Sequence, residues 1–267
     1  MEIVNKENAI RSIVKSAVKA YANGFSTRHL AEVEDENGVI YMEMHNVFIA
    51  ALDKEIQHYV LTRSIRLSLD TMLESMAISI AELNYKVSQY VEGTLYREQT
   101  DYIVELLEQY HRRIPKIEDY QGITEKKGTA STKRHESDYY LVDEETGMHY
   151  LIELRIGGNL DNQKARSVKK ALLEQYCILS NKLGEGKVKI LFATAYNRYS
   201  EGKPWTQGRV LQYFSQQELC IGRDFWNLVC KSEHGFEIVI DEFTKDAHYI
   251  NDAFHEIINA YSEKGLW

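Results

Sequence analysis

Two carboxylates and one cation lie close together in the middle of the chain. Asp138 precedes a short run of aromatic and apolar residues, and Glu153 and Arg155 lie in a second apolar run. Residues two apart on a β-strand share a face, so we expect the side chains of Glu153 and Arg155 to point to the same side. A hairpin between the two runs would bring Asp138 beside them.

This combination of groups suits the hydrolysis of a phosphodiester. Mg²⁺ takes hard oxygen ligands and usually binds one or two protein carboxylates while keeping several waters. The metal polarises the phosphate and lowers the pKa of a bound water. A nearby cation stabilises the charge that develops on the phosphate oxygens. An Asp followed by Glu-x-Arg is also common on solvated surface hairpins, so the motif needs support from the rest of the chain.

The elements expected around these residues follow from local patterns. Residues 138–142 and 148–154 read as two strands joined by the turn Asp-Glu-Glu-Thr-Gly. Gly157 and Gly158 end the second strand. A long basic helix is expected over residues 161–183, and a buried strand over residues 187–196.

The remainder of the chain is predicted mostly helical. Residues 41–110 carry apolar side chains at three- and four-residue steps, and Pro115 closes this half. Residues 122–136 read as a polar loop, and residues 245–262 as a closing helix. We therefore expect an α/β fold: a mixed central sheet flanked by helices, with a large N-terminal helical elaboration. Residues 1–115 would form the helical region and 116–267 the core, as one structural unit overall.

Several segments together resemble a known enzyme family. They are residues 68–74 (SLDTMLE), 152–176 (IELRIGGNLDNQKARSVKKALLEQY), 193–209 (ATAYNRYSEGKPWTQGR) and 218–230 (ELCIGRDFWNLVC). Each is weakly specific, but their order resembles the PD-(D/E)XK nucleases, and among these the type II restriction endonucleases of the TdeIII group, which read GGNCC-like sites. The resemblance implies an Mg²⁺-dependent enzyme that cuts double-stranded DNA at a short GC-rich palindrome.

The resemblance also implies roles for individual residues. Asp138 matches the first acid of the motif and Glu153 the second, both as metal ligands. Arg155 stands where the family usually has lysine, and arginine remains protonated and cannot act as a base. Either Arg155 stabilises transition-state charge, or Lys164 on the following helix takes the lysine's role, or the enzyme is disabled. Glu74, in the helical half, is a further candidate metal ligand and catalytic residue.

The charge distribution permits contact with DNA. The chain has a net charge of -8, but residues 111–210 carry 18 Lys or Arg against 13 Asp or Glu, whereas the rest carries 14 against 27. A basic segment can face phosphates while an acidic body keeps the protein soluble. The three cysteines show no CxxC pairing, and no apolar run is long enough to span a membrane. These features favour the cytoplasm of a bacterial or archaeal host.

Candidate DNA contacts lie on both sides of the buried strand. Arginine and lysine bind guanine edges in the major groove, so the long polar side chains after that strand are candidates for base readout: Arg198, Lys203, Gln207 and Arg209. Lys169 and Lys170, on the basic helix, are expected to contact phosphates.

Other expectations follow from the implied function. A palindromic site favours a symmetric homodimer, with residues 1–115 as its expected interface, and a host needs a cognate DNA methyltransferase to protect its own sites. Three alternatives remain: a catalytically silent DNA-binding protein of the same fold, a repair or resolvase-type nuclease, and a helical protein without DNA function.

Overall fold

The computed structural model describes residues 3–34, 54–121, 123, 128–158 and 160–263. The chain divides into two compact units, residues 1–76 with 237–267, and residues 77–236. The boundary that we expected between residues 115 and 116 is therefore wrong. Residues 77–115 belong with the sheet, and the C-terminal helices belong to the helical unit.

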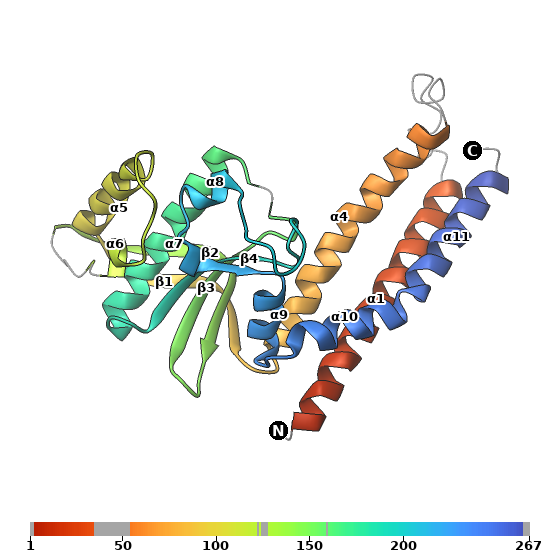
Figure 1. Cartoon of the computed structure of the whole chain (residues 1–267), viewed down its shortest axis with the longest axis horizontal. Coiled ribbons are helices and arrows are strands. Elements are labelled where there is room, and N and C mark those ends of the chain that lie inside the picture. The colour runs from red at the N-terminus through yellow and green to blue at the C-terminus, as the bar shows by residue number, and fades with distance from the viewer. Residues whose placement is uncertain (1–2, 35–53, 122, 124–127, 159, 264–267) are drawn as a thin grey trace. The chain divides into compact units, whose positions relative to one another are not determined.

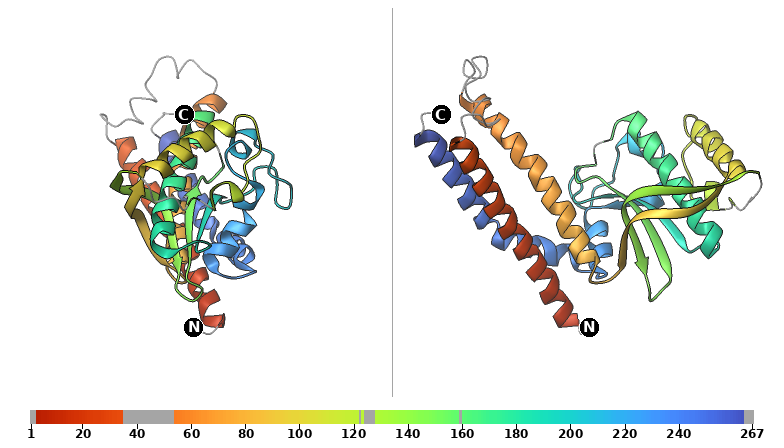
Figure 2. Two further views of the ribbon diagram at one scale, coloured as in Figure 1. Left: turned by 90° about the vertical axis from the view of Figure 1, so that its left-hand side faces the viewer. Right: turned by 180° about the vertical axis from the view of Figure 1, so that it is seen from behind.

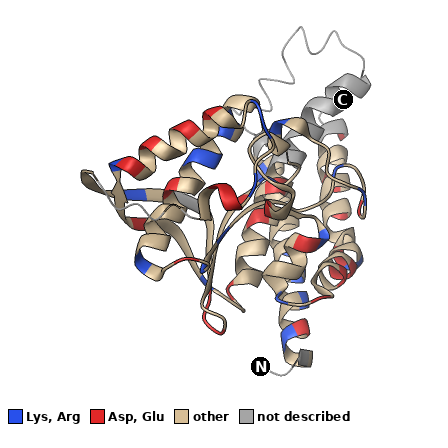
Figure 3. Ribbon diagram, turned by 60° about the vertical axis from the view of Figure 1, so that its left-hand side comes forward, with Lys and Arg blue, Asp and Glu red and all other residues tan. Residues whose placement is uncertain are grey.

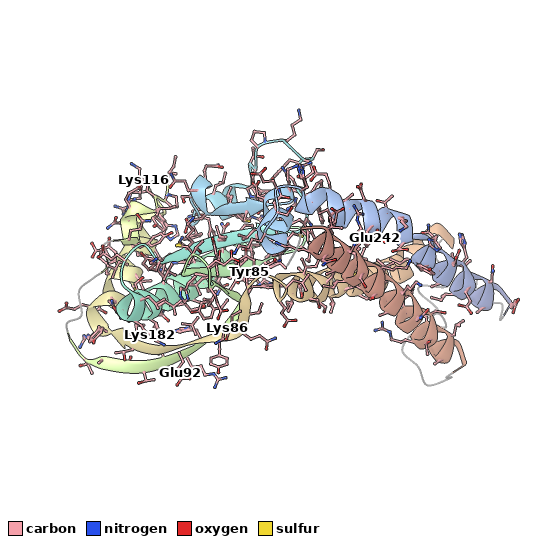
Figure 4. The ribbon with its side chains drawn as sticks, turned by 90° about the horizontal axis from the view of Figure 1, so that it is seen from below. Tyr85, Lys86, Glu92, Lys116, Lys182 and Glu242 are labelled. Atoms are coloured by element: carbon pink, nitrogen blue, oxygen red, sulfur yellow. The ribbon has the colours of Figure 1, made fainter. Side chains whose placement is uncertain are left out.

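The first unit is helical. Its helices are α1 (Ile3–Glu34), most of α4 (Lys54–Ala81), most of α10 (Gly235–Asp246) and α11 (His248–Glu263). Helices α1 and α11 lie side by side (Figure 1). Residues Ile10, Val14 and Val18 are buried on α1 at four-residue steps, which is the spacing of one helix face. Polar contacts flank this stripe: Ser26 donates to Glu256 at 2.7 Å, and Arg11 lies 3.4 Å from Glu242. Figure 4 labels Glu242 on α10.

The second unit is built on a five-stranded sheet of order β1-β2-β3-β4-β5. The strands are β1 (Lys86–Tyr96), β2 (Ala130–Asp143), β3 (Met148–Leu154), β4 (Val188–Thr194) and β5 (Leu219–Ile221). Neighbouring strands from β1 to β3 are antiparallel, and those from β3 to β5 are parallel. The sheet is therefore mixed, as expected.

Helices pack against this sheet and contribute side chains to a shared hydrophobic core. They are α5 (Arg97–Gln109), α6 (Glu118–Gln121), α7 (Asn162–Leu183), α8 (Gly208–Leu211), the short 3-10 helix η1 (Gln216–Glu218) and α9 (Arg223–Cys230). Helix α7 joins β3 to β4 and lies across the sheet (Figure 2). Its buried Leu172 and Leu173 belong to one core with Leu151 of β3 and Phe192 of β4. The α/β architecture expected from the sequence is confirmed.

The elements around the candidate site agree closely with the predictions. The hairpin of β2 and β3, helix α7, strand β4 and helix α11 all lie where the local patterns put them. The helical prediction for residues 41–110 holds for α4 and α5, while residues 35–53 lie outside the described part of the chain. Phe225 and Trp226, on α9, are buried in the core.

Strand β1 corrects the helical prediction for its residues. Val91 and Leu95 are buried four residues apart, a spacing that also suits a helix. On a strand, Gly93 shares their face, and a Cβ at Gly93 would lie 2.6 Å from Ile178 Cγ2. The close approach of α7 therefore requires glycine at this position, and glycine hides the two-residue apolar period in the sequence.

Strand β2 also begins earlier than expected. We predicted a loop over residues 122–136, but the strand starts at Ala130 and pairs with β1 from Tyr96↔Ala130 onward. The side chains from Ala130 to Arg134 are exposed. Because this part of β2 is polar and solvated, it lacks the alternating apolar pattern that marks a half-buried strand.

The start of β1 is fixed to the end of α9. The Tyr85 hydroxyl donates to the Leu228 carbonyl oxygen at 2.7 Å, and Asn84 Nδ2 donates to the Val229 carbonyl oxygen at 3.0 Å. Tyr85 is buried, and Figure 4 marks its position. Both bonds are accepted by carbonyl groups in the last turn of α9, where the helix leaves acceptor capacity open.

Candidate active site

Strands β2 and β3 bring the first two motif positions together. Their ladder runs from Asp143↔Met148 to Tyr139↔Ile152. Asp138 precedes Tyr139 in β2 and Glu153 follows Ile152 in β3, so the two positions are neighbours across the end of this ladder. The side chain of Asp138 lies outside the described part of the chain, and its role as a metal ligand stays a prediction.

An irregularity in β2 falls at the same place. Ser88 of β1 pairs with Tyr140 and Tyr90 pairs with Glu136. Between these two pairs, β2 contains residues 137–139 whereas β1 contains only residue 89. Asp138 therefore lies among the residues that β2 has in excess of its partner strand. A bulge bends its strand and re-aims a side chain, and bulges are common beside active sites. Strand β2 leaves β3 here and continues with β1 alone.

Glu153 and Arg155 form an ion pair at the end of β3. Arg155 Nη2 lies 2.5 Å from Glu153 Oε1, which confirms that the two side chains share a side. The Glu153 side chain is only 12% exposed, whereas that of Arg155 is 44% exposed. A buried carboxylate needs a compensating partner, and Arg155 supplies it. The guanidinium keeps an open face toward solvent, where a phosphate can approach.

Beyond β3 the backbone keeps its parallel pairing with the end of β4 and the residue after it. Arg155 N donates to the Ala193 carbonyl oxygen at 2.9 Å, and Ala195 N donates to the Ile156 carbonyl oxygen at 3.2 Å. Gly158 has φ +66°, and a Cβ there would overlap the Trp205 indole. Both its backbone conformation and its close packing therefore require glycine.

Lys164 lies in the first turn of α7, and its side chain is exposed. The Asp161 side chain caps this helix by accepting from Lys164 N at 2.7 Å. The cap fixes the start of α7 shortly after Gly158. The proposed catalytic role of Lys164 stays a prediction, because no described contact ties its ammonium to Glu153.

Glu74 lies on α4, in the first compact unit, with an exposed side chain. Glu153 lies in the second unit. The part of Glu74 in metal binding and catalysis therefore stays a prediction.

The loop after β4 is held by its own polar contacts. Asn197 N donates to Glu201 Oε1 at 2.9 Å, and Asn197 Nδ2 donates to the Lys203 carbonyl oxygen at 2.7 Å. Tyr199 N donates to Asn197 Oδ1 at 3.0 Å. Trp205 is buried against Phe192 and Tyr199. These contacts give the loop a defined shape.

The candidate base readers sit on this loop and just after it. The side chains of Arg198, Lys203 and Arg209 are exposed, and that of Gln207 is half-buried. Figure 3 shows basic positions here and on α7, whereas acidic positions recur along α5. The exposure of these residues is compatible with contact to DNA, and their roles stay predictions.

Lys169 does not face solvent, and the prediction that it contacts phosphates is wrong. Its side chain is 0% exposed and forms an ion pair with the equally buried Glu218. Burial lowers the pKa of Lys169, while the charge of Glu218 opposes that shift. Tyr120 donates to Glu218 Oε1 at 2.7 Å, and Ser215 N donates to Oε2 at 2.8 Å. This enclosed network joins α7 to the segment before β5.

Lys170, the next residue, is 45% exposed and lies 3.9 Å from Glu174, so its phosphate contact remains a prediction. Glu174 also pairs with His135 of β2 at 3.1 Å. Burial would raise the pKa of Glu174, but His135 and the nearby lysines lower it overall. We did not single out His135 or Glu174 from the sequence, because no local pattern joins residues so far apart in the chain.

The described residues are compatible with a magnesium site of few protein ligands. Among them, no group of three or more His, Cys, Asp or Glu side chains could hold a metal. Mg²⁺ needs only one or two carboxylates when waters complete its shell. Glu153 provides a buried, oriented carboxylate at the strand end, and the backbone puts Asp138 beside it. The donor chemistry at this edge therefore fits the ion.

Comparison with known proteins identifies the family of the chain. A family model described as type II restriction endonuclease, HinfI, matches residues 6–246. No curated protein and no solved structure matches the chain. No helix in the described part of the chain is long and apolar enough to cross a membrane. The matched region includes the β2–β3 hairpin, α7 and the loop after β4, and on this match the chain belongs to the HinfI family of type II restriction endonucleases.

Proposed function

We propose that the protein is an Mg²⁺-dependent PD-(D/E)XK nuclease that hydrolyses phosphodiester bonds in both strands of double-stranded DNA at a specific site. The observation that carries this proposal is the edge formed by β2 and β3. There the buried Glu153 pairs with the open Arg155, across from the Asp138 position at a bulge. A solvated surface hairpin would leave its carboxylates exposed.

Asp138 and Glu153 would hold the metal, with Glu74 as a third candidate ligand. The ion supplies Lewis acidity and a water of lowered pKa. Arg155 orients the Glu153 carboxylate through the ion pair, and its exposed face donates to a phosphate oxygen. Because arginine stays protonated, it stabilises charge and accepts no proton. Lys164 is the alternative source of the positive charge that lysine usually supplies in this fold.

DNA recognition falls to the loop after β4 and to α7. Arg198, Lys203, Gln207 and Arg209 are proposed to read base edges, because their side chains extend from a loop held in shape by Asn197. Lys170 is proposed to contact a phosphate. The GC-rich palindrome that we propose as the site rests on the resemblance to the TdeIII group alone.

The assembly and the setting are further parts of the proposal. A palindrome presents two identical half-sites, so a two-fold symmetric homodimer would place one Glu153 on each strand. The N-terminal helical region, residues 1–115, is the proposed dimer interface. Such an enzyme works in the cytoplasm of a bacterium or archaeon, with a DNA methyltransferase that protects the host's sites.

The test is cleavage of a large plasmid or phage DNA with Mg²⁺ and with EDTA. We expect discrete fragments with Mg²⁺ and none with EDTA, Asp138→Ala or Glu153→Ala. Glu92→Ala is the matched control, because Glu92 is an exposed glutamate on β1, and it should cut like the wild type. Sequencing of the fragment ends determines the site and its base composition. Random degradation would instead indicate a repair or resolvase-type nuclease, which does not depend on one sequence.

A second candidate is a catalytically silent DNA-binding protein of this fold. The Arg155–Glu153 pair favours it, since the guanidinium occupies a carboxylate oxygen that a metal would use. Arg155→Lys separates the two cases. Cleavage that appears only in this variant would support the silent protein, and equal or reduced cleavage would support an active enzyme that uses arginine.

A further inference from the structure

Tyr196 lies near the candidate active site, two residues beyond the end of the neighbouring strand β4. Strands β3 and β4 are parallel, with Glu153 opposite Phe192. The pairing continues past their ends, where Ala195 N donates to the Ile156 carbonyl oxygen. Tyr196 is the next residue, and it is 42% exposed. A large aromatic side chain thus stands open to solvent at the edge that carries Glu153.

The phenol of Tyr196 lies against Gly157, in the segment that follows β3. A Cβ on Gly157 would lie 2.7 Å from Tyr196 Oη and 3.4 Å from Cζ. A real Cβ is not found as close as 2.7 Å to another heavy atom, whereas 3.4 Å is close to ordinary van der Waals contact. The hydroxyl therefore occupies the space above Gly157, two residues after Arg155. Glycine at position 157 is what allows it to lie there.

The backbone of Tyr196 is held on both sides. Thr194 Oγ1 donates to the Tyr196 carbonyl oxygen at 2.9 Å. On the other side, Asn197 N donates to Glu201 Oε1. No described residue forms a hydrogen bond with the Tyr196 hydroxyl. The backbone around Tyr196 is thus held in place, and the hydroxyl, without a hydrogen-bond partner among the described residues, lies against Gly157, two residues after Arg155.

We propose that the Tyr196 hydroxyl binds a phosphate oxygen of the DNA strand that enters this site. The inference rests on the proposed nuclease function. A neutral O–H donor makes a short, strong hydrogen bond to an anionic oxygen. Its position beyond Arg155 lets the two side chains contact the same strand. Tyr196 thereby orients the backbone for attack, and Gly157 keeps the place of the hydroxyl clear.

The experiment is a double-mutant cycle on Tyr196→Phe and Gly157→Ala. Removal of the hydroxyl should lower kcat/KM for plasmid cleavage about ten- to hundred-fold. Gly157→Ala should cause a similar loss in the wild-type background, because its methyl group displaces Oη. In the Tyr196→Phe background that methyl group meets only Cζ. The double variant should therefore be no worse than Tyr196→Phe, a strongly non-additive result.

Tyr90→Phe is the matched control, because Tyr90 is 45% exposed on β1 and its ring keeps the stacking contact with Arg134 without the hydroxyl. It should cleave like the wild type. Wild-type rates in Tyr196→Phe would overturn the proposal. Additive losses in the double variant would also overturn it, since they would mean that Gly157 and the hydroxyl act independently.

Binding measurements keep this test separate from the test of the nuclease function. If the wild type does not cleave, affinity for a long duplex in EDTA still reports the contact. Tyr196→Phe should then bind several-fold more weakly with an unchanged salt dependence, because a neutral side chain releases no counterions. Unchanged affinity would overturn the contact, whereas absent cleavage with weakened binding would overturn only the nuclease proposal.

Discussion

Two ion pairs in the sheet-containing unit have opposite surroundings. Lys169 and Glu218 are both fully buried, and Tyr120 and Ser215 supply further hydrogen bonds to the carboxylate. Glu153 is also buried, but its partner Arg155 is 44% exposed. The enclosed pair has no open side on which a substrate could bind, so it holds elements together. The pair at the strand end keeps one open side, on which a substrate has room to bind.

The comparison also separates what each pair contributes to stability. Removal of one partner from an enclosed pair leaves an uncompensated charge in the interior. Removal of the Glu153 charge from the open pair leaves the solvated guanidinium of Arg155, and we expect this to lower the free energy of unfolding only slightly. Substitution in the open pair should therefore change mainly the cleavage rate. Substitution in the enclosed pair should change mainly the free energy of unfolding.

The largest effect is expected from neutralising the open pair. Glu153→Gln keeps the shape of the side chain but removes a proposed metal ligand, so cleavage with Mg²⁺ should fall at least about 10³-fold. The free energy of unfolding should change by less than about 1 kcal/mol. Initial cleavage rates and urea titrations measure the two quantities. Cleavage within ten-fold of the wild type would remove Glu153 from the site.

The enclosed pair should show the reverse. Lys169→Met leaves Glu218 buried without its cation and should cost about 3–5 kcal/mol in the free energy of unfolding. Urea titration measures this loss, and cleavage per folded molecule should be unchanged. Lys169→Met combined with Glu218→Gln removes both charges and should recover part of the loss. A large drop in DNA affinity without loss of stability would mean that Lys169 does reach phosphates.

A third pair, intermediate in exposure, sharpens the comparison through pH. Lys231 lies 2.9 Å from the buried Asp143 and 2.6 Å from the exposed Glu145. Burial alone would raise the pKa of Asp143, but hydrogen bonds from Lys231 and the Thr146 turn lower it overall. Since the folded pKa lies below the unfolded value, the stabilisation is present above the unfolded pKa. It is lost as the pH falls through the folded pKa.

Lys231→Met should therefore cost about 1.5–2 kcal/mol near neutral pH, and the difference from the wild type should shrink as the pH falls below about 4. Urea titrations at several pH values measure it. Glu144→Gln, which changes an exposed carboxylate in the same turn, is the control and should show little effect. A difference that grows toward acid pH would contradict the assigned shift of Asp143.

The sequence could predict those parts of the molecule whose signals are local. The hairpin with Asp138 and Glu153, the capped helix α7 and the buried strand β4 are each recognisable from a few consecutive residues. The shared face of Glu153 and Arg155 follows from the two-residue period of a strand. The candidate site could therefore be located from residue order alone.

Features that depend on distant partners could not be predicted in this way. Gly93 hides the apolar period of β1 because α7 packs against it, through Ile178. Lys169 looks like a solvated residue of a basic helix until Glu218, far along the chain, is brought against it. Burial, partner choice and the close approach of Tyr196 to Gly157 are decided by packing between elements. Local patterns located the β2–β3 hairpin, α7, β4 and the candidate site residues. Only the tertiary structure decided which charges are enclosed and which stay open to solvent, because burial depends on contacts between distant elements.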